Sequence, residues 1–211
     1  ARSAALRARL RGEPVDTARV ELFDRLLHGF AEIAPPAPLP AAVGERIAVL
    51  PFVEAYFSNF IEGTEFTFDE ASSIVYEGID PTARPADAHD VRGTFAIASS
   101  DDAMRRTPST PDDLHALLKE RHAVLMGGRP DKQPGAFKQR ENRAGSTLFV
   151  APRLVEGTLD AGFERYAQLD DPFWRAAFMM FLITETHPFD DGNGRVARLM
   201  MNAELVVADQ T

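Results

Sequence analysis

The chain has 211 residues, of which 45% are hydrophobic and 26% are charged, so it can build a sizeable core and is not an intrinsically disordered protein. Its net charge of −9 argues against nucleic acid as the main partner, because no basic excess is present to neutralise phosphates. The absence of cysteine excludes disulfides and thiolate metal sites, which agrees with a reducing compartment.

The two ends of the chain carry little targeting information. The N-terminal stretch ARSAALRARLRG is basic but lacks the apolar segment of a signal peptide, and the longest apolar run, residues 176–183, is too short to cross a bilayer. We therefore expect a cytoplasmic protein that does not bind membranes. Because the sequence begins with Ala1 and stops soon after its last motif, we also expect a trimmed or partial protein that lacks a further domain.

Hydrophobic spacing predicts helices through the first third of the chain. The first covers residues 16–33 and ends at the linker APPAPLP, residues 34–40. Helix is expected to resume near Ala41 and to pause at Pro51, which suits a first helical turn. An apolar face then continues to Gly63.

Capping signals place the next helices. Thr67 and Glu70 have the spacing of a capping box and predict a helix that runs to about Gly78. A loop is expected over residues 80–90, followed by helix over residues 91–100. The run Thr-Pro-Asp-Asp from Thr110 is a strong start for a helix that ends at the glycine pair 127–128.

Two histidines, His115 and His122, lie seven residues apart on one face of that helix. We interpret them as structural or surface residues rather than metal ligands, because no carboxylate pair completes a metal site near them.

The segment 146–150 is the only convincing β-strand, and a hairpin built on it should lie against the helices. Upstream, Lys138, Arg140 and Arg143 are either solvated charges or line the mouth of a site. Helices are predicted over residues 157–169 and 172–186, and we expect the second to be the buried central helix.

The stretch ETHPFDDGNGRVARLM, residues 185–200, holds the strongest chemical signal. Pro188 disfavours helical geometry at His187, and Gly192 and Gly194 permit positive φ and close approach of a ligand. The N–H groups of the following helix then suit a phosphate.

Side chains around this turn add a base, a carboxylate and two cations. Arg195 and Arg198 share a helix face, Asp191 suits a hard cation such as Mg²⁺, and His187 titrates near neutral pH. The residues thus predict a nucleotide phosphate site. A plain helix end or turn explains less, and a calcium loop is excluded because its first and twelfth positions would be Phe189 and Met200.

The run HPFDDGNGRVAR, residues 187–198, resembles the Fic family signature H-P-F-x-[DE]-G-N-G-R-x-x-R at every fixed position. The resemblance implies a mostly helical enzyme that transfers a nucleoside monophosphate, usually AMP from ATP, to a protein hydroxyl. Gly194 supports this branch, because a lysine there marks the kinase-like branch of the superfamily.

The resemblance assigns roles to the signature residues. His187 is the general base and Asp191 ligates Mg²⁺. The anion nest and the cations that hold the β- and γ-phosphates are Gly192, Asn193, Gly194, Arg195 and Arg198.

The family also has a β-hairpin flap that covers the active site and pairs with the target's backbone. Residues 137–151 resemble it in place and type, and the docking residues would be Thr147, Leu148, Phe149 and Val150. An ordinary short hairpin is the alternative.

A second motif, Ser-Asn-Phe-Ile-Glu-Gly at residues 58–63, resembles the family's inhibitory motif [ST]-x-x-x-E-[GN]. Ser58 and Glu62 lie four apart on one helix face, and Gly63 suits a left-handed helix end. By resemblance, Glu62 pairs with Arg198 and blocks the productive pose of the ATP γ-phosphate. The alternative is an exposed glutamate at a helix end.

We therefore expect an all-α, Fic-type helical bundle with a small β-hairpin flap. Residues 1–105 would form an N-terminal helical region carrying the inhibitory helix at about 51–63, and residues 106–211 the catalytic core. The expected activity is autoinhibited adenylyl transfer to Ser, Thr or Tyr of a target protein and of itself, with ATP as co-substrate and Mg²⁺.

Transfer of UMP or phosphocholine, or removal of AMP from a modified protein, stays open, as does a nucleotide-sensing interaction module. The expected partner is a protein substrate; a homodimer is left open.

Overall fold

The computed structural model describes residues 14–37 and 45–210, and most of them are helical. The long helices are α2 (Thr17–Glu32), α3 (Glu45–Ile61), α5 (Pro85–Ala98), α7 (Pro111–Leu125), α8 (Val155–Tyr166), α9 (Pro172–Thr186) and α10 (Asn193–Val207). The short elements are α4 (Phe68–Ser72), the π-helix η1 (Ser73–Glu77), α6 (Asp101–Met104) and the 3₁₀ turns η2 (Pro130–Lys132) and η3 (Pro152–Leu154).

The strands β1 (Arg143–Ala144) and β2 (Thr147–Leu148) form an antiparallel hairpin in which Arg143 pairs with Leu148. The all-α class with one small hairpin is thus confirmed. In the described ranges, every helix falls short of the length and apolar composition that crossing a bilayer requires.

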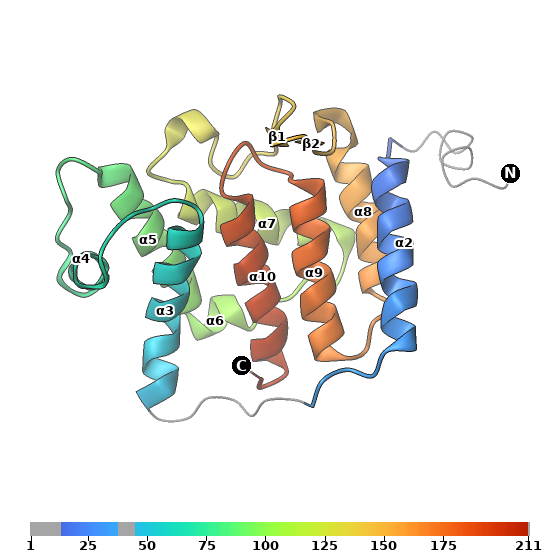
Figure 1. The fold of residues 1–211 in the computed structure, drawn as a ribbon, viewed down its shortest axis with the longest axis horizontal. Coiled ribbons are helices and arrows are strands. Elements are labelled where there is room, and N and C mark those ends of the chain that lie inside the picture. Colours follow the sequence, from blue (N-terminus) through green and yellow to red (C-terminus); the bar gives the residue numbers. More distant parts are fainter. Residues whose placement is uncertain (1–13, 38–44, 211) are drawn as a thin grey trace, which may run out of the picture.

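The centre of the fold is the packed pair α9 and α10, with α2 and α8 on one side and α3 on the other (Figure 1). The main core fills the space among α2, α7, α8, α9 and α10, and its fully buried members include Phe23, Leu118, Leu159, Phe178 and Val196. Phe30 of α2 stacks on Trp174 of α9 with ring centroids 4.3 Å apart. Although α2 is the first helix of the described residues, it therefore packs in the core of the C-terminal half.

Side-chain caps fix where several helices begin. Asp16 Oδ1 accepts hydrogen bonds from two N–H groups of α2, and Thr110 caps α7. The predicted capping box is confirmed, because Thr67 Oγ1 accepts from the Glu70 N–H while the Glu70 carboxylate accepts from the Thr67 N–H.

The expected pause at Pro51 is wrong, because α3 continues through it to Ile61. Proline removes one backbone hydrogen bond, but the next turns bury Phe52 and Ala55 in a second apolar cluster with α5, and that packing keeps the helix in one piece. The expected resumption of helix near Ala41 lies outside the described residues.

The predicted strand over residues 146–150 is only partly correct. Pairing stops at Leu148, and the Phe149 N–H donates to Asn142 O at 3.2 Å. Val150 is fully buried in the main core, so its expected place on a docking edge is wrong. Burying this side chain draws the chain away from its neighbouring strand.

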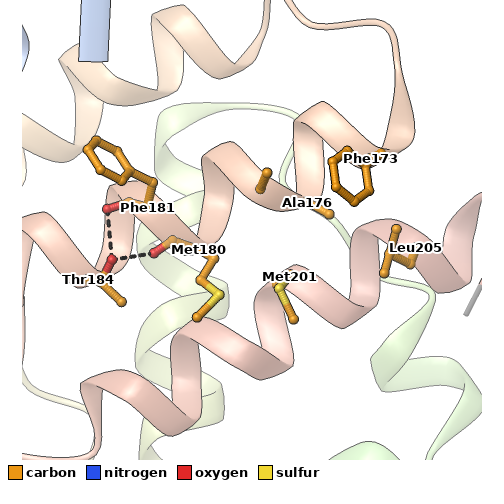
Figure 2. Close-up of a pocket in the computed structure, with 8 residues that line it drawn as sticks. Phe173, Ala176, Met180, Phe181, Thr184, Met201 and Leu205 are labelled. Carbon is orange, nitrogen blue, oxygen red and sulfur yellow. Dashed lines mark hydrogen bonds between the residues drawn. The ribbon is translucent and has the colours of Figure 1, made fainter. Parts of the chain in front are cut away.

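The expectation of a fully buried α9 is also only partly correct. Its outer face and α10 line a surface pocket of about 380 Å³ (Figure 2). The lining is apolar, and includes Phe173, Met180, Phe181, Met201 and Leu205. Thr184 at one end already donates its hydroxyl to backbone carbonyls of its own helix, 2.8 Å from Met180 O and 3.1 Å from Phe181 O.

Candidate active site

The loop between α9 and α10, residues 187–192, places the predicted site residues at the end of the central helix pair (Figure 1). His187 ends α9 with a left-handed backbone (φ 51°), and its N–H donates to Ile183 O at 2.8 Å. Asn193 braces the loop, because its side-chain amide exchanges two 2.8 Å hydrogen bonds with the backbone of Phe189. Asn193 therefore positions the loop through its side chain.

The buried side chain of Phe189 anchors the loop to the core. Its buried ring stacks on His122 with centroids 3.8 Å apart and planes 5° apart. His122 Nδ1 accepts from the Gly135 N–H, so Nε2 carries the proton and donates to Asp191 O at 3.2 Å. Burial lowers the pKa of His122 to about 4, which keeps it neutral. His122 is thus structural, and so is His115, which lies 3.0 Å from Asp160.

The His187 imidazole is held on two sides. Its Nδ1 lies 3.3 Å from Thr184 O, and because a carbonyl only accepts, Nδ1 carries the proton and Nε2 is left as a base. The Phe149 ring stacks on the imidazole with centroids 3.7 Å apart. Burial lowers the pKa of His187, so the ring is neutral at neutral pH and ready to accept a proton.

The start of α10 forms an anion site from backbone groups. Gly192 precedes the helix with φ 74°, and the N–H groups of Asn193, Gly194 and Arg195 have no partner within the helix. Gly194 leaves room for the Glu62 carboxylate, because an added Cβ would overlap Glu62 Oε1 unless that flexible side chain moved. The Glu62 carboxylate therefore lies directly against this helix N-terminus.

Arg198, one turn along α10, binds the end of α3. Its Nη2 lies 2.6 Å from Glu62 Oε1, and it donates from Nε to Ser58 Oγ at 2.7 Å and from Nη2 to Ser58 O at 2.9 Å. The left-handed Gly63 (φ 90°) ends this helical segment just after Glu62. The structure thus brings together Ser58, Glu62 and Arg198, which are far apart in the sequence.

Arg195 is buried, and its guanidinium is already bound. Nη1 donates to Asp90 Oδ2 at 2.6 Å and to Asn59 Oδ1 at 3.2 Å. Asp90 is fully buried and also accepts from Arg129 Nε at 2.8 Å. Arg195 therefore ties α10 to α3 and α5, and it would have to exchange Asp90 for a phosphate to contact one. Sequence reasoning missed Asp90, for which no local motif exists.

Asp191 fits a role in holding Mg²⁺ only together with a ligand. Its side chain is exposed, and Oδ1 accepts from the Gly192 N–H at 2.7 Å and lies 3.6 Å from Arg195 Nη2. Within the described ranges, no three His, Asp or Glu side chains group into a metal site. Mg²⁺ commonly binds through one or two carboxylates plus substrate phosphates, and a single exposed carboxylate beside an anion site suits that arrangement.

A comparison with protein families decides the relationship. Residues 112–205 match the model of the Fic/DOC family, a range that contains the whole loop, all of α9 and most of α10. Residues 112–205 of this chain form a Fic/DOC-family domain.

Curated relatives of this Fic protein include a Fido domain-containing protein of Dictyostelium discoideum, 32% identical over 34% of this chain and 53% of its own length. The "Protein adenylyltransferase Fic" of Nematostella vectensis is 26% identical over 81% of this chain and 40% of its own. The "Protein adenylyltransferase Fic" of Drosophila persimilis is 28% identical over 74% of this chain and 32% of its own length. This chain thus spans about a third to a half of the length of these relatives.

Solved structures show the same fold. Fic-1 (residues 134–508) of C. elegans superposes with a TM-score of 0.62 at 20% identity, covering 90% of this chain and 57% of the other. A Fic domain-containing signalling protein of Bacteroides thetaiotaomicron superposes with a TM-score of 0.64 at 17% identity, covering 90% of this chain and 73% of the other.

The hairpin of this Fic domain lies beside the loop. Asn142 Nδ2 donates to Phe189 O at 2.9 Å, and Arg19 of α2 donates to Leu148 O at 3.0 Å. Thr147 and Leu148 are exposed, whereas Phe149 faces His187. The hairpin is thus tied to the Fic loop through Asn142 and to α2 through Arg19, while the side chains of Thr147 and Leu148 are exposed.

The three basic residues before the hairpin differ in environment. Lys138 is buried, donates to Asn142 Oδ1 at 2.6 Å, and has its pKa lowered by burial to about 8. Its backbone N–H donates to Pro188 O at 2.9 Å, so Lys138 belongs to the wall of the Fic loop. Arg140 is largely exposed 3.5 Å from Asp190, and Arg143 is solvated.

Proposed function

We propose that this Fic domain transfers AMP from ATP to a hydroxyl side chain of a protein, including itself, and that Glu62 inhibits the transfer. The observation that carries the proposal is the free Nε2 of His187 beside the unpaired N–H groups of α10, with a carboxylate already at that anion site. Relatives named protein adenylyltransferase, with 26–28% identity in the two cited above, support the choice of AMP.

In the proposed reaction, Nε2 of His187 takes the proton of a Ser, Thr or Tyr hydroxyl. The hydroxyl oxygen forms a bond to the α-phosphorus of ATP while the bond from that phosphorus to the bridging oxygen breaks, and pyrophosphate leaves. The N–H groups of Asn193, Gly194 and Arg195 hold phosphate oxygens, and Arg198 contacts the γ-phosphate once Glu62 has left it.

Asp191 is the residue that would hold Mg²⁺. When bound, the ion offsets the charge of the phosphates. The exposed edge of the hairpin at Thr147 and Leu148 is the proposed place where the target's backbone pairs. There Leu148 O would exchange its hydrogen bond from Arg19 for one from a backbone N–H of the target.

Inhibition follows from competition between two anions. The Glu62 carboxylate and the γ-phosphate both need Arg198 and the N-terminus of α10, where negative charge is stabilised. Each 1.4 kcal/mol in favour of Glu62 lowers the competent population about tenfold.

Labelling with ATP that carries the label on its α-phosphate tests the proposal. Wild-type protein should label itself weakly, and Glu62→Gly should raise labelling at least tenfold, about 1.4 kcal/mol. Adding His187→Ala to Glu62→Gly should abolish the signal while leaving ATP binding within a few-fold. Equal labelling of wild type and Glu62→Gly refutes the inhibition.

Competing activities give different results in the same assay. Stronger labelling from UTP or from a phosphocholine donor than from ATP would show that the transferred group is UMP or phosphocholine rather than AMP. Tight ATP binding without any labelling of Glu62→Gly would indicate a nucleotide-sensing module.

A further inference from the structure

The outer surface of α3, α4 and η1 exposes a group of large apolar side chains. These are Phe57 (52% exposed), Phe60 (52%), Ile61 (66%), Phe68 (53%) and Tyr76 (58%), which we call the α3–α4 patch. α3 and α4 lie at the edge of the molecule away from α2 and α8 (Figure 1). The neighbouring face of α3 carries Ser58 and Glu62, which contact Arg198.

The patch is continuous. Tyr56 contacts the rings of Phe57, Phe60 and Phe68, with centroids 5.1, 6.2 and 5.6 Å away. The Phe52 ring contacts both Phe68 and Tyr76, with ring centroids 4.9 and 5.5 Å away, and so connects the two. Four exposed aromatic side chains on one connected set of rings, with Ile61 next to them in the sequence, exceed the isolated apolar residues of an ordinary surface, and such patches mark interaction sites.

Tyr76 belongs to the patch because of an unusual turn. It lies in the π-helix η1, which continues α4 and ends at the left-handed Gly78. π-turns are rare and concentrate at functional sites. This turn directs Tyr76 onto Phe52 while leaving most of its surface exposed.

The segment that carries the patch is acidic, and Arg84 and Arg92 reach its edge, where Arg84 donates to Glu65 O at 2.6 Å and Arg92 pairs with Asp80. Residues 48–83 contain no Lys, Arg or His, and their seven acidic residues are Glu54, Glu62, Glu65, Asp69, Glu70, Glu77 and Asp80. Glu65, Asp69 and Glu77 are exposed and take part in none of the ion pairs among the described residues. A partner that covers the aromatic rings therefore meets a rim of uncompensated carboxylates.

The shape of the patch favours a helix. Leu50, Phe57 and Ile61 follow one stripe of α3 at spacings of seven and four residues. From Leu50 to Ile61 the stripe is about 17 Å long at 1.5 Å per residue, or about three helical turns. An amphipathic helix packs its apolar side along such a stripe.

We propose that the α3–α4 patch binds a basic amphipathic helix of a partner protein. Its leucine- or phenylalanine-like side chains cover the rings, and its lysines or arginines meet Glu65, Asp69 and Glu77. An anionic membrane does not fit, since the acidic rim repels it.

Fluorescence anisotropy with a labelled, 18-residue peptide of leucine and lysine, with leucine at helical spacing, tests the surface. The peptide should bind the wild-type protein, and Phe57→Ser/Phe60→Ser should weaken binding at least tenfold. Val124→Ser, which removes a comparably exposed side chain from α7, is the matched control and should bind like wild type. Unchanged affinity of the double variant overturns the proposal.

Charge and competing occupants are tested separately. Glu65→Lys/Asp69→Lys/Glu77→Lys should also weaken binding at least tenfold, and a peptide with glutamate in place of lysine should not bind. Equal binding of both peptides overturns the charge argument. Self-association, or binding to phosphatidylcholine–phosphatidylserine vesicles, that the double serine variant abolishes would assign the patch to another occupant. These assays do not depend on AMP transfer.

Discussion

The Phe149 ring lies parallel to the His187 imidazole, with centroids 3.7 Å apart and planes 6° apart. The contact joins the hairpin to the general base of the proposed reaction. It also removes water from one face of the imidazole, which disfavours the charged form and contributes to the lowered pKa of His187.

Phe149→Ala should move the acid limb of the activity profile to higher pH. The base must be neutral, and restoring water to the imidazole raises its pKa, so activity is lost at a higher pH than in the parent. The measurement is the rate of self-labelling against pH in the Glu62→Gly background. Leu148→Ala, an exposed hairpin neighbour, is the control and should keep the parent profile; a Phe149→Ala profile that stays in place contradicts the assignment.

Asp191→Ala should remove the Mg²⁺ dependence of ATP binding, because the exposed carboxylate beside the anion site is lost. Calorimetric titration with ATP, with and without Mg²⁺, measures the difference in ATP affinity that the ion causes. Asp190→Asn alters the adjacent carboxylate and should keep the wild-type difference in affinity. If Asp191→Ala also keeps that difference, Asp191 does not hold the ion.

Arg198→Ala should not mimic Glu62→Gly. It releases the inhibitory carboxylate but also removes the proposed γ-phosphate contact, so labelling should stay low. Ser58→Ala removes only the hydroxyl that accepts from Arg198 Nε and should activate less than Glu62→Gly. Labelling of the three variants side by side is the measurement, and an Arg198→Ala variant as active as Glu62→Gly would exclude a role for Arg198 in binding ATP.

Asp90→Ala should destabilise the fold by about 3–5 kcal/mol, because it leaves the buried Arg195 guanidinium without its carboxylate. Asp87→Ala, which removes a more exposed partner of Arg84 and Arg129, should cost about 1 kcal/mol. Urea unfolding of both variants measures the difference. Similar losses for the two would show that the Asp90–Arg195 pair is not a main support of the loop.

His122 should make stability fall in mild acid. Its pKa is about 4 in the folded protein and about 6.5 when unfolded, so between these values the unfolded chain binds more protons. Stability is therefore fully present above about pH 6.5 and declines by about 2–3 kcal/mol towards pH 4. Urea unfolding at several pH values in this range measures the free energy of unfolding. That free energy should depend less steeply on pH in His122→Phe than in wild type, and an identical pH dependence would contradict the buried neutral imidazole.

The sequence alone identified the features that are set by residues close together in the chain. The twelve residues from His187 to Arg198 carry the turn, the glycines and the helix start within one segment, so their spacing predicts the site directly. The capping box at Thr67 and Glu70 is equally local. The pairing of Glu62 with Arg198 came from resemblance to a family motif, and the 2.6 Å contact agrees with it.

Only the tertiary structure decided the contacts between distant segments. Asp90 and Arg195 are 105 residues apart, and His122 and Asp191 are 69 apart, so no spacing rule links them. Phe149 and Val150 are adjacent apolar residues of one predicted strand, yet one stacks on His187 and the other enters the core. Residue type sets how strongly a side chain favours burial, but the packing of the whole chain selects what it is buried against.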